Sequence, residues 1–232
     1  MSQTPHANNI VLVHGAFADA SSWSKVAFLL EAKGYKVTSV PNPLTSFKDD
    51  VAATQTAIDA ADGPVILVGH SYGGVVITEA GNDPKVVGLV YVAAFAPDAG
   101  QSIGEITQGF PKPIGLDKVA PQADGFLLLT QDGIETGFAQ DLTKEEQAHL
   151  IAIQPQTHGS IFAAQPTKAA WHTKPSWYIV ASNDNMIAPE HEASMAKLLK
   201  ATTTTLPSSH VVMLSHPQEV AKVIEDAATT AK

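Results

Sequence analysis

The stretch Gly69-His70-Ser71-Tyr72-Gly73 constrains the fold of this chain more than any other feature. It has the form G-x-S-x-G, with the apolar, largely β-branched run Val65–Val68 before it and the apolar run Val75–Ala80 after it. This context predicts a buried strand, a sharp turn and a helix, with the serine on the turn. The Ser71 hydroxyl should then stand free above a sheet. Because G-x-S-x-G also occurs by chance in glycine-rich proteins, other segments must decide whether it marks a nucleophile.

Apolar runs typical of strands alternate with helical patterns at both ends of the chain. Between these runs, Ser46 is placed to cap the second helix, and Pro217 to begin the last one. This alternation predicts an α/β fold with about six mostly parallel strands in a doubly wound sheet. Besides the run before Ser71, the expected strands are Ile10–Val13, Lys36–Val40, Val87–Ala94, Ser176–Ala181 and, at an edge, Thr202–Leu206.

The alternation breaks down in the middle of the chain. Between residues 97 and 174, Gly, Pro and Gln accumulate, and the periodicity is helical only in pieces such as Lys144–Ile153. A length of 232 residues suits one domain with a large insertion. We therefore predict a core formed by residues 1–96 and 175–232, and a helical cap inserted at 97–174.

Composition limits the partners of the chain. Its net charge is −9, and all 14 basic residues are lysines. Without arginine there is no bidentate clamp for phosphate, and an acidic surface repels polyanions, so we expect a neutral small-molecule substrate and no nucleic acid. The absence of cysteine excludes disulfides, thiolate catalysis and cysteine-ligated metal.

Two further features concern location. Residues 1–6 lack the basic and apolar regions of a signal peptide, and no apolar run approaches the ~20 residues that cross a bilayer. We expect a cytoplasmic protein without a membrane span. The sequence leaves the oligomeric state open, with a homodimer as one alternative.

A serine nucleophile needs a base, and the base needs a group that orients it. Asp184 and His210 each follow a predicted strand, and the loops at the carboxyl ends of parallel strands converge in space. We therefore predict Ser71, His210 and Asp184 as nucleophile, base and acid. Asp98 is the rival acid and His216 the rival base.

The oxyanion of an acyl-transfer intermediate needs two backbone donors. One is expected from Tyr72 N–H, and the other from the loop after the first strand, with Ala16 as first choice and Phe17 as second. The side chain of His14 is expected to brace that loop. Apolar residues of the same loop and of the insertion are candidates for the substrate pocket. They are Phe17, Phe126, Leu128, Phe138, Phe162 and Trp171.

Taken together, these motifs resemble the α/β-hydrolase superfamily, in its branch of plant methylesterases, hydroxynitrile lyases and bacterial carboxylesterases. The resemblance spans nearly the whole chain, including Val11–Ala16, the turn at Ser71, and Asp184 followed by His210. It implies the α/β-hydrolase fold and hydrolysis of small to medium neutral carboxylic esters through an acyl-enzyme, without cofactor or metal.

The same resemblance leaves other activities open. Hydroxynitrile lyases of this branch carry a threonine and a lysine where this chain has Gly15 and Val211, which favours hydrolysis. Haloalkane dehalogenases would need a carboxylate at Ser71. Perhydrolase or haloperoxidase-type activity, and a non-catalytic protein that binds a small ligand, remain as alternatives.

Overall fold

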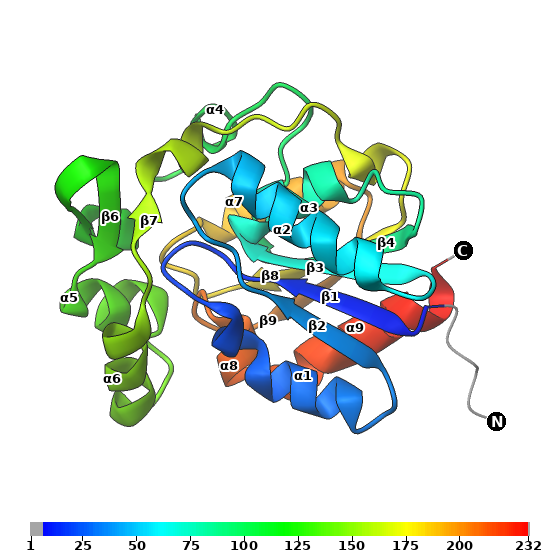
Figure 1. The fold of residues 1–232 in the computed structure, drawn as a ribbon. Coiled ribbons are helices and arrows are strands. Elements are labelled where there is room, and N and C mark those ends of the chain that lie inside the picture. Colours follow the sequence, from blue (N-terminus) through cyan, green and yellow to red (C-terminus); the bar gives the residue numbers. More distant parts are fainter. Residues whose placement is uncertain (1–6, 232) are drawn as a thin grey trace.

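The computed structural model describes residues 7–231, shown in Figure 1. Its centre is a six-stranded sheet in the order β2-β1-β3-β4-β8-β9, and every neighbouring pair is parallel. The strands are β1 (Asn9–Val13), β2 (Lys36–Val40), β3 (Val65–Ser71), β4 (Val86–Ala94), β8 (Ser176–Ala181) and β9 (Thr202–Leu206). Residues 1–6, which carried the expectation about a signal peptide, lie outside the described residues.

Helices cover both faces of this sheet (Figure 1). One face carries α1 (Ser24–Glu31), α8 (Val212–Ser215) and α9 (Pro217–Thr230), and the other α2 (Phe47–Ala60), α3 (Gly73–Ala80) and α7 (Pro189–Leu198). Because both faces are covered, every residue of β1 and of β3 is buried, as their apolar runs require. The prediction of an α/β doubly wound sheet is confirmed.

Local signals in the sequence mark where two of these helices begin. The Ser46 hydroxyl accepts a hydrogen bond from Asp49 N–H at 3.1 Å and caps α2, and Pro217 is the first residue of α9. The threonine-rich β9 lies at the sheet edge and is partly exposed, as predicted.

Much of residues 97–174 lies at the left of Figure 1, beyond the carboxyl ends of the central strands, and the rest crosses the top of the picture. The expected helix Lys144–Ile153 is present as α6, and a three-stranded antiparallel sheet that the predicted helical cap did not include accompanies it. The other elements are α4 (Ile103–Ile106), β5 (Val119–Pro121), β6 (Phe126–Leu129), α5 (Gln131–Gly133) and β7 (Thr157–His158).

Single helical turns complete the description. They lie at Ala20–Trp23, Ile114–Lys118, Ala123–Gly125, Ile134–Phe138, Gly159–Ala163 and Ala170–His172. Within residues 7–231, no helix combines the length and the apolar character that crossing a membrane requires.

Candidate active site

Ser71 is the last residue of β3 and adopts a left-handed backbone with φ of +54°. This conformation is uncommon for a residue with a side chain and reverses the chain sharply before α3. The turn brings α3 against the first strand, where a Cβ on Gly73 would lie only 2.6 Å from the Val13 carbonyl oxygen. The glycine is therefore needed for the close approach that sets Ser71 at the end of the sheet.

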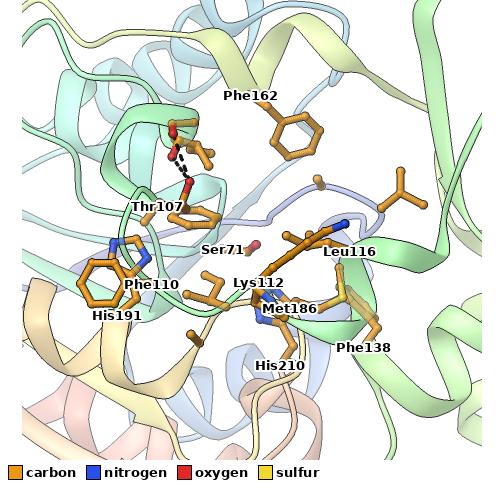
Figure 2. A pocket seen from close by; sticks show the side chains of 18 of the residues that line it. Ser71, Thr107, Phe110, Lys112, Leu116, Phe138, Phe162, Met186, His191 and His210 are labelled. Atoms are coloured by element: carbon orange, nitrogen blue, oxygen red, sulfur yellow. Dashed lines mark hydrogen bonds between the residues drawn. The ribbon is translucent and has the colours of Figure 1, made fainter.

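Ser71 faces a cavity of about 390 Å³. Loops that follow the central strands form one wall, and residues 97–174 form the other. His210 lies in the same wall as Ser71, and Figure 2 shows both among mainly apolar side chains. A cavity of this size and character suits a small organic molecule.

Asp184 holds the imidazole of His210. The His210 Nδ1 lies 2.5 Å from Asp184 Oδ2, and both side chains are almost fully buried. The other oxygen of Asp184 accepts hydrogen bonds from the backbone N–H groups of Met186 and Ile187, at 2.6 and 3.0 Å. A carboxylate fixed in this way selects the tautomer with hydrogen on Nδ1, which leaves the lone pair on Nε2.

No hydrogen bond joins the Ser71 hydroxyl to His210 within the part of the chain that the structure describes. The two side chains instead share the cavity wall. Catalytic hydrogen bonds are often long in the absence of substrate and shorten when it binds. The shared wall makes His210 a candidate base for the Ser71 hydroxyl.

His70 contacts the backbone of His210, the candidate base, and sequence reasoning missed this contact. Its Nε2–H donates to the backbone carbonyl of His210 at 2.9 Å, and their rings lie 4.7 Å apart between centroids. Complete burial lowers the pKa of His70 well below its usual range, so the ring is neutral. The residue that precedes the candidate nucleophile thus positions the loop of the candidate base.

Glu192 is a second buried carboxyl beside Asp184, and it too was missed. Its Oε2 accepts a hydrogen bond from Ala181 N–H at 3.0 Å, and its side chain is fully buried. Burial, reinforced by the negative charge of Asp184, raises the pKa of Glu192 well above its usual range. Glu192 is therefore a neutral acid, and its Oε1 makes no hydrogen bond with the described residues. Its one sequence signal was an acidic residue on the buried side of a helix.

Two backbone amides near Ser71 are available to an incoming oxygen atom. Among residues 7–231, the N–H groups of Ala16 and Tyr72 donate to no acceptor, whereas Phe17 N–H donates to Thr157 Oγ1 at 3.1 Å. This difference favours Ala16 over Phe17. A Cβ on Gly15 would lie 2.6 Å from the Cβ of Ser71, so the loop fits only with glycine there.

His14 braces the same loop. Its Nε2 accepts a hydrogen bond from Asn42 N–H at 3.1 Å, so the proton is on Nδ1, which lies 2.9 Å from the Gly15 carbonyl oxygen. Burial lowers the pKa of His14, in keeping with a neutral ring. This geometry matches the bracing role expected from the sequence.

The rival residues lie elsewhere. Asp98 is partly exposed and pairs with His172 at 2.9 Å, while His216 contacts the hydroxyl of Ser215 at 3.0 Å at the start of α9. Neither Asp98 nor His216 lines the cavity. Residues 7–231 contain no group of three or more His, Asp and Glu that could hold a metal ion.

Three of the expected pocket residues line the cavity, and three do not. Phe17, Phe138 and Phe162 form part of its wall. The expectations for Phe126, Leu128 and Trp171 are corrected. Alternate side chains of a strand point to opposite faces, so Leu127 enters the cavity while its neighbours Phe126 and Leu128 turn away. The indole N–H of Trp171 donates to the Pro97 carbonyl, outside the wall.

Residues 10–223 match the model of the alpha/beta hydrolase family, and the chain belongs to this family. Its relatives include Methylesterase 2 of Arabidopsis thaliana, 26% identical with 94% of this chain and 95% of that protein covered. A pyrethroid hydrolase of Sphingobium wenxiniae is 29% identical, with 95% and 87% covered. Among solved structures, a pyrethroid hydrolase from Sphingobium faniae superposes with a TM-score of 0.82 at 24% identity, covering 97% of this chain and 98% of that one. The predicted resemblance to the methylesterase branch is confirmed.

Proposed function

We propose that this protein is a carboxylesterase in which Ser71 is the nucleophile, His210 the general base and Asp184 the residue that orients the base. The observation that carries the proposal is the buried Asp184–His210 pair, which presents an imidazole at the wall of the cavity that also holds Ser71. Relatives that are named methylesterase and pyrethroid hydrolase support ester cleavage.

The proposed reaction has two steps. In the first, Ser71 Oγ attacks the ester carbonyl carbon while its proton moves to His210 Nε2, and the negative oxygen accepts hydrogen bonds from Ala16 and Tyr72 N–H. Collapse of this intermediate breaks the bond to the alcohol oxygen, which takes the proton from His210. Water then attacks the acyl-enzyme by the same route and releases the acid.

The character of the cavity wall supports small to medium, neutral esters as the substrate class. No carboxylate of the described residues lines it, and its few polar side chains lie among many apolar ones. We propose that residues 97–174 act as a cap that holds the acyl or alcohol group.

The alternatives on the same residues receive less support. Cyanohydrin cleavage in the hydroxynitrile lyases uses a threonine where Gly15 stands and a lysine where Val211 stands. Gly15 has no room for a side chain, and Val211 is fully buried. Perhydrolysis would be a side activity of the same acyl-enzyme. A pure binding protein would have no need of the buried Asp184–His210 pair.

The test uses short p-nitrophenyl esters and a fluorophosphonate probe. The wild type should hydrolyse p-nitrophenyl acetate and gain one phosphonyl group per chain. Ser71→Ala should remove the label and lower kcat/KM by roughly 10⁴-fold or more. Ser194→Ala, which changes an exposed serine on α7, serves as the matched control.

Three outcomes would count against the proposal. An inert wild type that is not labelled would favour a binding protein. Label retained in Ser71→Ala would assign the nucleophile elsewhere. Mandelonitrile offered in parallel tests the lyase alternative, because dominant cyanide release would replace hydrolysis as the main activity.

A further inference from the structure

His191 places an unpaired polar group in the wall of the cavity. The residue lies in α7, is 3% exposed and lines the same cavity as Ser71 and His210. Neither of its ring nitrogens makes a hydrogen bond with any of residues 7–231. Its ring stacks on Phe110 with centroids 4.2 Å apart and planes at 20°, so its position is fixed (Figure 2).

The other polar side chains of the wall are already engaged. Thr107 Oγ1 donates to the Ile103 carbonyl at 2.9 Å, and the exposed ammonium of Lys112 pairs with Asp117. Ser71 and His210 are assigned to the reaction itself. Apart from Ser71 and His210, His191 is therefore the one polar side chain among the described lining residues that makes no hydrogen bond within the protein.

The charge of His191 limits what it can bind. Burial lowers its pKa to about 4, so the ring is neutral near pH 7 and offers one N–H donor and one nitrogen acceptor. The neutral ring gives a ligand carboxylate no counter-charge, so burying a carboxylate beside His191 in this apolar wall is unfavourable. Neutral hydroxyl and keto oxygens suit a neutral imidazole.

We propose that His191 is a substrate-binding residue that recognises a second, neutral oxygen of the ester, a hydroxyl or keto group set apart from the scissile carbonyl. This inference rests on the proposed esterase function and narrows its substrate class. An analogue without that oxygen would leave the buried ring nitrogen of His191 without a partner. Because an unpaired buried polar group is unfavourable, the site would bind the analogue less well than the oxygenated ester.

The experiment compares esters that differ only at the second oxygen. Ethyl 4-oxopentanoate is paired with ethyl 4-methylpentanoate, ethyl 6-hydroxyhexanoate with ethyl heptanoate, and 4-hydroxybutyl acetate with pentyl acetate. We expect the wild type to favour the oxygenated member of at least one pair by roughly three- to tenfold in kcat/KM, the range of one hydrogen bond. The pair that responds shows whether the oxygen is keto or hydroxyl and on which side of the ester it lies.

Variants of His191 test whether its ring nitrogens cause the preference for the oxygenated esters. His191→Phe keeps an aromatic ring against Phe110 and should abolish the preference while the apolar esters are still hydrolysed. His191→Gln restores a donor and an acceptor and should recover part of it. His149→Phe, which changes an exposed histidine on α6, is the matched control and should leave the preference intact.

A binding measurement separates this inference from the esterase proposal. In Ser71→Ala, calorimetric dissociation constants for the same pairs should show the same preference, and adding His191→Phe should remove it. Equal affinity within every pair, or a preference that survives His191→Phe, would overturn the role of His191. Selective binding without any turnover in the wild type would instead overturn the esterase proposal and leave His191 as a ligand-binding residue.

Discussion

The core sheet and the inserted segment 97–174 contribute to the candidate site by different means. In the core, the reactive side chains are held by buried polar contacts, such as those from Asp184 and His70 to His210. The inserted segment contributes mainly apolar side chains, among them Phe138 and Phe162. Polar contacts in the core therefore fix the candidate reactive groups, whereas the insertion adds mainly apolar surface to the cavity.

The two regions are nevertheless joined at the loops that carry Asp184 and His210, the candidate acid and base. Asp141 Oδ2 accepts a hydrogen bond from Ser209 N–H at 2.8 Å, next to His210. Gln140 Nε2 donates to the Asn183 carbonyl at 2.6 Å, next to Asp184. The insertion is therefore placed to influence the geometry of the reactive groups as well as the pocket.

Among changes that leave Ser71 in place, the largest loss of activity should come from the candidate acid in the core. Asp184→Asn removes the carboxylate that selects the His210 tautomer, and kcat should fall by roughly 10³- to 10⁴-fold. Asp98→Asn, which changes the partly exposed rival acid, should stay within about twofold because exposed pairs contribute little. Steady-state kinetics on p-nitrophenyl acetate measure both. A larger loss of activity in Asp98→Asn than in Asp184→Asn would assign the acid to Asp98, in the loop after β4, instead of Asp184.

A smaller loss of activity should follow when the contact between Asp141 of the insertion and Ser209 of the core is removed. Asp141→Ala leaves Ser209 N–H without its acceptor and loosens the loop of His210, so kcat should fall by roughly ten- to a hundredfold. Asp132→Ala, which removes an exposed pair with Lys118, is the control. If both variants behave alike, the insertion has no part in positioning the base.

Truncation of the apolar wall should alter selectivity rather than rate. Phe162 lines the cavity and stacks on Phe17 with ring centroids 6.3 Å apart. Phe162→Ala enlarges the cavity and should shift the ratio of kcat/KM for longer over shorter acyl esters by about tenfold, with activity on acetate largely kept. Phe28→Ala, at a side chain that is 70% exposed, is the control. An unchanged chain-length profile would mean that the acyl group binds elsewhere.

The smallest effect on activity, and a distinct effect on stability, is expected at Glu192. Glu192→Gln keeps the acceptor for Ala181 N–H and a neutral side chain of nearly the same shape, so activity should change by less than roughly twofold. The pKa of Glu192 is raised in the folded protein, so the wild type loses stability as pH rises above the unfolded value of roughly 4.3. The glutamine variant lacks this loss.

Urea unfolding at several pH values measures that difference. The free energy of unfolding of Glu192→Gln, relative to the wild type, should rise with pH by about 1.4 kcal/mol per pH unit, until Glu192 ionises in the folded wild type. Glu190→Gln, exposed on the same helix, is the control. A flat difference for Glu192→Gln would show that Glu192 is not a neutral acid in the folded protein.

The core could be predicted from sequence because its central strands are buried on both faces and read as continuous apolar runs, while its edge strands are short β-branched runs in the alternation with helices. Lys36–Val40, Ser176–Ala181 and Thr202–Leu206 form strands with the expected bounds. The sheet of the insertion escaped prediction because β5 has three residues and β7 only two, which is too short for a periodic pattern. Its pairing depends on contacts between residues far apart in the chain.

The candidate site likewise has a part that could be predicted from sequence and a part that could not. Ser71, Asp184 and His210 could be proposed because each lies at the end of a strand or in the loop after one, and parallel strands bring these positions together. The contact of His70 with the His210 carbonyl joins residues 140 positions apart, and nothing local signals it. The pocket was predicted only in part, because aromatic side chains look alike in a sequence whether they face a cavity or a core.

The backbone at Ser71 has a consequence for engineering. Folding alone would favour glycine at this turn, because a left-handed residue with a Cβ carries a local cost of roughly 1–2 kcal/mol. A laboratory selection for heat resistance without an assay for turnover would therefore tend to discard the hydroxyl and return sturdier, inert proteins. Libraries built on this scaffold should keep that codon fixed.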